Sequence, residues 1–425
     1  MKTRYLAYLL LFAIGTSLNA QKKSKQVDDW KQGWTAFDPN QIEYPEGETI
    51  LEGFIKEDLH LSRFTTYVLS GDVYVTNGAK LSIGAGTVIR CSSDKPGNLI
   101  ITKGSKFVAM GSQRIPIIFT SDKPAGQRTP GDWGGIYVLG SGTVSSQNTA
   151  TNQLDQLLLE YNAFGGDHRT EETVIMKYVR LEYGGKRLTS DTDGSSLTLC
   201  ALGSSSNLEN ISVSFSENDS YTLYGGDGYY SKLISYKTGD DDFQVMNGFK
   251  GGIKKGLVLR DPGVITSGNS YAIEAVGVLE DQEKEKPGTT EFAFFRDIIF
   301  ASMHEDSNAD QIHPLVFLKN LGKIHIYDST VSGFSGIVAF DDSFVSENQI
   351  RKSFTINNSL ININNEGLIL PNTIEPTYLQ SIVMYNKYTN NFIGFSRLFK
   401  NTLLEDLPYF RLDEEYIESA RITEN

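Results

Sequence analysis

The chain has 425 residues, with 39 Lys or Arg against 52 Asp or Glu, which gives a formal net charge of −13. This acidic balance argues against nucleic acid or another polyanion as a partner, because a negative surface repels polyanions. Its 40 glycines, 12 prolines and 11% aromatic residues exclude a disordered or collagen-like chain, and two cysteines exclude a disulfide scaffold.

The first 20 residues have the layout of a secretory signal peptide. Lys2 and Arg4 give a charged start, residues 5–14 are apolar, and a polar end leads to Ala20, where we expect cleavage. A membrane anchor would need about 20 apolar residues. No later stretch is long and apolar enough to span a bilayer. We therefore expect an exported protein, either secreted or held at the cell surface or outer membrane.

Residues 21–65 carry Trp30, Trp34 and Phe37 among charged residues. Because the open end of a repeat stack exposes an apolar core and a strand edge, such a segment is predicted to be an N-terminal cap.

Internal repeats begin after this segment. Residues 77–83 and 103–109 align at an offset of 26, and each is followed by a β-rich run. Residues 211–226 and 233–248 align without a gap at an offset of 22. That second alignment places Asp219 on Asp241, Tyr221 on Phe243, Leu223 on Val245 and Gly226 on Gly248. Each unit combines turn glycines with short alternating strands.

A period of 22–26 residues leaves no room for a helix and is too short for a propeller blade. It favours an all-β fold, a single-stranded parallel β-helix, in which Tyr221 stacks on Phe243 and Leu223 on Val245 in the interior. We place the coils at 66–370, with polar loop insertions near 141–172 and 279–292 that protrude, and a C-terminal cap at 371–425. An immunoglobulin-like sandwich is the structural alternative.

The acidic run of Asp240, Asp241 and Asp242 is the candidate metal site. The offset of 22 places Asp219 one coil away, about 5 Å from Asp241. Carboxylates at that spacing repel one another unless a cation or a donor lies between them, and Ca²⁺ accepts several such oxygens. The competing interpretation is a turn whose aspartates accept backbone N–H groups.

Acidic clusters near basic side chains also occur in metal-assisted polysaccharide lyases. Lys237, Arg180 and Lys254 are the bases that such a mechanism could use, although no motif places them. Cys91 and Cys200 lie several coils apart and are predicted to be buried free thiols. His325 alternates with Ile324 and Ile326, which predicts an outward strand position.

Several motifs together resemble a family of secreted parallel β-helix proteins of Bacteroidetes cell envelopes, most of them without assigned activity. The resemblance covers roughly residues 66–260 and rests on the runs Leu81–Ile89, Pro116–Ser121, Gly131–Ile136, Val179–Gly185 and Asp240–Phe243. It implies a right-handed β-helix at the cell envelope. We therefore expect a non-catalytic module that binds a polysaccharide or an envelope or surface protein. A polysaccharide lyase or glycoside hydrolase is the alternative.

Overall fold

The computed structural model describes residues 29–145, 154, 157–186, 194–265, 269–277, 292–306, 313–363, 367–374, 379, 381–389, 391–403 and 409–421. The chain divides into two units, Met1–Trp30 and Lys31–Asn425, and all that follows concerns the second. The predicted signal peptide at residues 1–20 lies outside the described residues.

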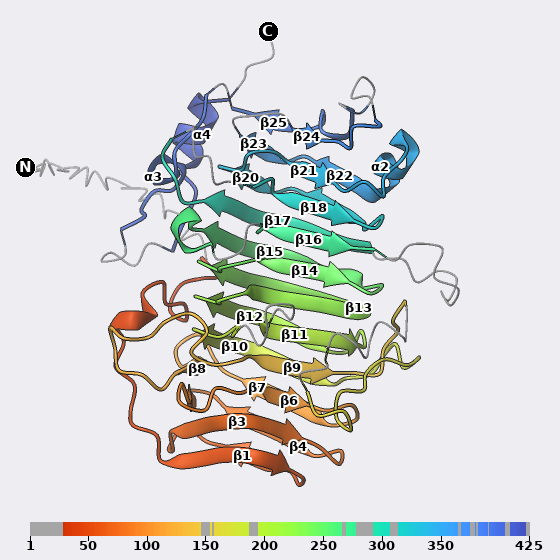
Figure 1. The fold of residues 1–425 in the computed structure, drawn as a ribbon. Helices are drawn as coiled ribbons and strands as arrows, with labels where there is room; N and C mark the ends of the chain where they lie inside the picture. Colours follow the sequence, from red (N-terminus) through yellow and green to blue (C-terminus); the bar gives the residue numbers. More distant parts are fainter. Residues whose placement is uncertain are drawn as a thin grey trace, which may run out of the picture. The chain divides into compact units, whose positions relative to one another are not determined.

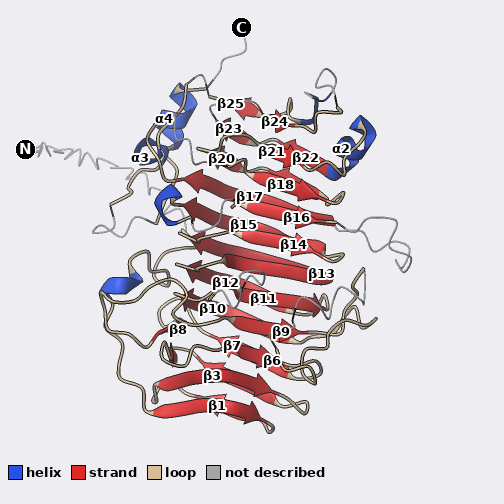
Figure 2. Ribbon diagram, viewed as in Figure 1, coloured by secondary structure: helices blue, strands red, loops and turns tan. Residues whose placement is uncertain are grey.

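Short parallel strands form three faces. The strands stack in chain order, with β1 at one end of the stack and β25 at the other (Figures 1 and 2). The first face contains β2 (Leu59–Leu61), β4 (Lys80–Gly84), β7 (Lys106–Met110), the first part of β10 (Val174–Glu182) and of β12 (Asn207–Ser214), the middle of β13 (Asp219–Tyr236), the first part of β15 (Lys250–Arg260) and of β17 (Phe292–Ser302), β19 (Ile324–Tyr327) and β22 (Phe354–Asn357).

The second face contains the first part of β1 (Thr49–Ile55) and of β3 (Tyr67–Val75), β5 (Val88–Cys91), β8 (Ile117–Ser121), the last parts of β10, β12, β13, β15 and β17, and β20 (Thr330–Ser332), β23 (Leu360–Asn362) and β25 (Lys387–Tyr388).

The third face contains the last parts of β1 and β3, then β6 (Leu99–Ile101), β9 (Ile136–Leu139), β11 (Ser195–Leu202), the first part of β13, β14 (Phe243–Met246), β16 (Ile273–Val276), β18 (Val316–Lys319), β21 (Val338–Phe340) and β24 (Leu368–Ile369). Helical segments are short: η1 (Pro39–Gln41), η2 (Pro262–Val264), α2 (Glu347–Ser353), α3 (Phe395–Leu398) and α4 (Glu414–Ser419).

The register between coils confirms the repeat analysis. Tyr221 pairs with Phe243 and Leu223 with Val245 across β13 and β14, and the two rings stack with centroids 5.1 Å apart. Strands β4 and β7 pair in the register of the 26-residue offset. The side chains of Tyr221, Leu223, Phe243 and Val245 belong to one buried core that fills the space between the three faces. Parallel pairing excludes the sandwich alternative, whose sheets are antiparallel.

The chain passes from the first to the second face without a break in β10, β12, β13, β15 and β17. One residue with a positive φ turns each of these strands: Tyr178 (50°), Asn210 (58°), Lys232 (57°), Lys255 (65°) and Asp297 (59°). The strand registers place these residues at one corner in successive coils. Non-glycine residues other than Asn and Asp are strained in this region, so Tyr and Lys here destabilise the fold locally.

The coils begin earlier than the sequence suggested. Strands β1 and β2, which lie within the segment predicted to be a cap, pair in parallel with β3 and β4. The preceding residues instead run along the outside of the second face as an N-terminal strap, which we define as residues 31–48. In the strap, Trp34 packs edge-on against Tyr178, and Phe37 packs against Tyr236. Trp34 and Phe37 are buried, but against a side of the stack and not over its open end.

Part of the insertion at 141–172 packs against the stack, although it was predicted to protrude. Of its described residues, Leu154, Leu157 and Phe164 are buried in a second apolar cluster. That cluster lies outside the third face, where Tyr74 and Tyr224 point outward and need apolar cover. The insertion predicted at 279–292 lies outside the described residues, except for Phe292, which begins β17.

The coils also continue past residue 370, since β25 pairs with β23. In the remaining tail, Phe395, Phe399 and Phe410 form an aromatic cluster that contacts Phe37 and Tyr236 on the second face. The tail and the strap therefore meet. Across the described parts of the chain, no helix has the length and hydropathy that a membrane crossing requires.

Candidate functional site

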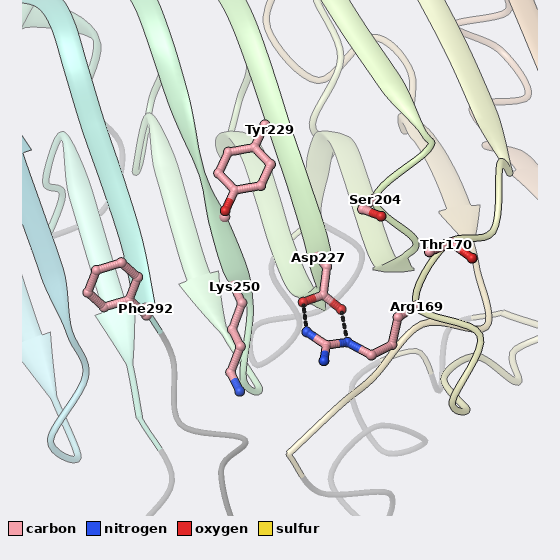
Figure 3. A pocket seen from close by; sticks show the side chains of 8 residues that line it. Arg169, Thr170, Ser204, Asp227, Tyr229, Lys250 and Phe292 are labelled. Carbon is pink, nitrogen blue, oxygen red and sulfur yellow. Dashed lines mark hydrogen bonds and ion pairs between the residues drawn. The ribbon is translucent and has the colours of Figure 1, made fainter.

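A groove of about 670 Å³ lies at the edge of the first face. It is lined by Arg169, Thr170, Ser204, Asp227, Tyr229, Lys250, Gly251 and Phe292 (Figure 3). Asp227, Lys250 and Phe292 occupy the same strand position in three successive coils. Successive side chains along these strands point alternately into the core and out of it. Tyr230 and Ile253 enter the core, and the side chains of Asp227, Lys250 and Phe292 face outward.

Asp227 is held by Arg169 across the groove. Arg169 Nε and Nη2 donate to the two carboxylate oxygens of Asp227, at 3.1 and 2.7 Å (Figure 3). Thr143 Oγ1 also donates to Asp227, at 3.3 Å. The hydrogen bond and charge of Asp227 raise the pKa of Arg169. This fork-on-fork pairing occupies both oxygens of the carboxylate, so Asp227 serves to position Arg169 and the insertion that carries it.

Ring side chains continue from the groove over the first face. We call Tyr229, Phe292, Phe294, His325 and Tyr327 the ring ribbon. The centroid separations are 5.7 Å for Tyr229 and Phe294, 4.8 Å for Phe292 and His325, and 6.4 Å for His325 and Tyr327. Tyr229 is 65% exposed and Phe292 is 45% exposed. Large apolar rings gathered in solvent are unusual on a monomer and indicate a binding surface.

Gly252 of β15 pairs with Tyr229 of β13 on one side and with Phe294 of β17 on the other, so it lies between these two residues. A methyl group at Gly252 would lie 2.6 Å from the Phe294 ring, so that ring rests directly on the glycine backbone. The missing side chain lets Phe294 lean toward Tyr229, and the two rings are tilted by 42° relative to each other.

The predicted metal residues are brought together in part. One oxygen each from Asp219, Asp240 and Asp241 lies within 4.8 Å of the others, and these residues are 2–7% exposed. Asp219 Oδ1 accepts the Asp241 N–H at 3.1 Å, and Asp241 Oδ1 accepts the Tyr271 N–H at 2.6 Å. The hydrogen-bonded turn stack is therefore present.

Burial, followed by the charges of Glu274, Asp219 and Asp240, raises the pKa of Asp241 well above its usual range. A cluster of this kind is stable when it shares protons or when a cation compensates it. An all-oxygen donor set suits a hard cation such as Ca²⁺. None of the three aspartates lines the groove, so a cation here would act on the fold.

Asp242 does not join this cluster, which corrects the four-residue prediction. It is fully buried and forms an ion pair with Arg260, and Ser235 Oγ donates to it. The Asp242 carboxylate faces the Arg260 guanidinium, whereas Asp241 Oδ1 accepts the Tyr271 N–H. The sequence contained no sign that Arg260 would lie opposite.

The bases considered for a lyase lie apart from the groove or are already paired. Lys237 Nζ lies 2.9 Å from Asp261, and buried Arg180 lies 3.0 Å from Glu182 and also donates to the strap residue Tyr44. Lys254 is exposed on the first face. Both cysteines are free and buried, as predicted. Burial raises the pKa of each thiol.

Sequence reasoning missed the groove and the ring ribbon. A signal was present in β17, where Phe292 and Phe294 alternate with the buried Ala293 and Phe295. Two phenylalanines on the outward side of a half-buried strand mark an exposed apolar surface. Arg169 gave no such signal, because it lies 58 residues from Asp227.

Comparison with known proteins bears on this fold. No curated protein and no solved structure matches the chain. A family model described as a pectate-lyase-like β-helix domain matches residues 53–392. This range contains the groove, the ring ribbon and all of the coils after the first residues of β1. The chain therefore belongs to the family of pectate-lyase-like β-helix domains.

Proposed function

We propose that this protein is an exported, non-catalytic β-helix module of the bacterial cell envelope that binds glycan through the groove and the ring ribbon. In this proposal the coils wind right-handed from a single chain. The observation that carries the proposal is the group of exposed rings on the first face, next to a groove with polar walls.

Stacking on sugars explains why rings would be kept in water. A pyranose presents a face of C–H groups that packs on an aromatic ring, while its hydroxyls need hydrogen-bond partners at the edges. The ribbon supplies the rings. The groove supplies the hydroxyls of Thr170, Ser204 and Tyr229 and the ammonium group of Lys250. A few polar groups beside apolar walls are typical of ligand sites.

The groove chemistry favours binding over hydrolysis. Glycoside hydrolysis requires two carboxyl groups on opposite sides of the scissile bond. Asp227 is the carboxylate among the groove-lining residues, and Arg169 occupies both of its oxygens. The buried aspartate cluster lies elsewhere, which supports a structural role for it.

Binding of the purified mature chain to an oligosaccharide panel tests the proposal. We expect binding that weakens about tenfold or more in Tyr229→Ala, a loss of about 1.4 kcal/mol. Phe64→Ala is the matched control, because Phe64 is also exposed but belongs to the turn after β2. Binding to no member of the panel, or release of unsaturated or shortened sugars, would contradict a non-catalytic glycan-binding role.

We also propose that Asp219, Asp240 and Asp241 hold a structural Ca²⁺. A cation that binds only the folded state, present at 100 times its dissociation constant, adds about 2.7 kcal/mol to stability. Melting in millimolar Ca²⁺ and in chelator, with Asp241→Asn as control, tests this. We expect a higher melting temperature with Ca²⁺ in the wild type and a smaller shift in the variant. Equal melting temperatures would leave the hydrogen-bonded turn stack as the explanation.

A further inference from the structure

The ring ribbon crosses the coils instead of following a strand. Tyr229 belongs to β13, Phe292 and Phe294 to β17, and His325 to β19. Neighbouring strands are about 4.8 Å apart. A ligand that touches these rings together must therefore lie across the strands, along the stacking direction of the coils.

The spacing of the rings fits consecutive sugars. The separations of 5.7 Å between Tyr229 and Phe294 and of 4.8 Å between Phe292 and His325 are comparable with the length of one pyranose in an extended chain. Because Phe294 rests on Gly252, no side chain interrupts the surface between it and Tyr229. A row of rings that crosses several coils suits an extended, unbranched chain better than a compact or branched one.

Several cations beside the ribbon are paired with carboxylates of the protein. Arg169 is paired with Asp227, and Arg296 Nε lies 3.2 Å from Asp328 while its guanidinium lies 5.2 Å from the centre of the Tyr327 ring. Lys255 lies 3.4 Å from Asp297. Glu209 is shared by two further cations, Lys177 and Lys232. A ligand carboxylate would have to compete with these protein carboxylates for each of these cations.

From this geometry we infer that the ligand is a neutral, extended, unbranched glycan that lies along the stacking direction of the coils over Tyr229, Phe294, Phe292 and His325. The inference rests on the proposed glycan-binding function and deepens it by naming the class and the direction of the chain. Stacking on rings, and not ion pairing, supplies the affinity.

Calorimetric titration of the full mature chain tests this with three probes of equal length: a β-1,4-linked gluco-oligosaccharide, a β-1,4-linked xylo-oligosaccharide and an oligogalacturonate. We expect at least one neutral probe to bind more tightly than the oligogalacturonate. Its affinity should change by less than about twofold between 0.01 and 1 M salt, although the Debye length falls from 30 to 3 Å over that range. Longer neutral probes should bind more tightly until the ribbon is covered.

Three variants connect such binding to the ribbon. Tyr229→Ala and Phe292→Ala should each weaken binding of the neutral probe about tenfold. Gly252→Ala removes no ring but displaces Phe294, and it should weaken binding similarly. Lys254→Ala, on the same face, and Phe64→Ala, away from it, should leave affinity unchanged. Circular dichroism and melting curves confirm that each variant is folded.

The possible results distinguish failure of the inferred ligand class from failure of the proposed glycan-binding function. Preferential, salt-sensitive binding of oligogalacturonate overturns the inference and leaves the glycan-binding function in place. Binding of a neutral probe that is unaffected by Tyr229→Ala, Phe292→Ala and Gly252→Ala also overturns it. Absence of binding to any glycan overturns the proposed function itself.

Discussion

Strand β13 carries two aromatic pairs whose environments are opposite. Tyr221 stacks on Phe243 inside the coils, where both rings are buried, and Tyr229 contacts Phe294 outside, where Tyr229 is 65% exposed. The inner pair joins neighbouring coils, and the outer pair spans two coils across Gly252. The inner pair excludes water from the core and so stabilises the fold. The outer pair leaves apolar area in water, and that area becomes useful only when a ligand covers it.

The largest expected effect is on the inner pair. Phe243→Ala removes a ring packed between Tyr221 and Phe295 and leaves a cavity, so we expect a loss of about 3–5 kcal/mol in the free energy of unfolding. Urea denaturation measures it. A loss below about 1 kcal/mol would mean that the interior ladder is loosely packed.

The buried ion pair should come next. Asp242→Ala leaves Arg260 charged and buried, at a cost of about 3 kcal/mol. Asp242→Ala combined with Arg260→Met should cost less than the sum of the single variants, because no unpaired charge remains. A double variant as damaging as that sum would show that the two residues act independently.

Asp241 should make stability depend on pH. Burial and the charges of Glu274, Asp219 and Asp240 raise its pKa in the folded state, so its protonation stabilises the fold below about pH 4, the unfolded value. That stabilisation is lost as pH rises through the raised folded pKa. In chelator at pH 7, Asp241→Asn should therefore be more stable than the wild type, and its stability should depend less on pH. An unchanged profile would contradict the assignment.

A smaller gain is expected at the corner between the first two faces. Lys255 has a φ of 65°, a conformation that Asn adopts more readily. Lys255→Asn should stabilise the protein by about 0.5 kcal/mol despite the loss of an exposed ion pair with Asp297. Lys254→Asn, one residue earlier in the strand, is the matched control and should give no gain.

The smallest effect on stability should come from the outer pair. Tyr229→Ala should change the free energy of unfolding by less than about 0.5 kcal/mol, because the ring is mostly in solvent already. The same variant should have the large effect on glycan binding given above. A large loss of stability would mean that the ring ribbon serves packing and would remove the contrast with the inner pair.

The coil register was predictable because it is local and repeated. Equivalent positions in neighbouring coils are 22 or 26 residues apart in the two repeats, and they keep the same residue type because each interior ladder must stay apolar. Tyr221 with Phe243 and Leu223 with Val245 are examples. The approach of Asp219 to Asp241 followed from the same register. The start of the coils at Thr49 was missed, because β1 is largely exposed and shows little apolar alternation.

Contacts between distant segments could not be predicted in this way. Arg169 meets Asp227 across 58 residues, and the strap residue Tyr44 meets Glu182 across 138 residues. Neither contact repeats along the chain, so no periodic sequence pattern predicts it. Asp242 illustrates the limit within a single run, since its neighbour Asp241 joins the carboxylate cluster while Asp242 pairs with Arg260.

By itself, then, the sequence determined the all-β class, the parallel stacking and the register of neighbouring coils, because a repeated apolar pattern has one way to bury its ladders. The tertiary structure decided where the strap and the tail lie, which outward side chains gather into the ring ribbon, and how Arg169 closes one side of the groove. Those outcomes depend on side chains from separate coils and insertions meeting in space, and the energies that select them act only once the coils have stacked.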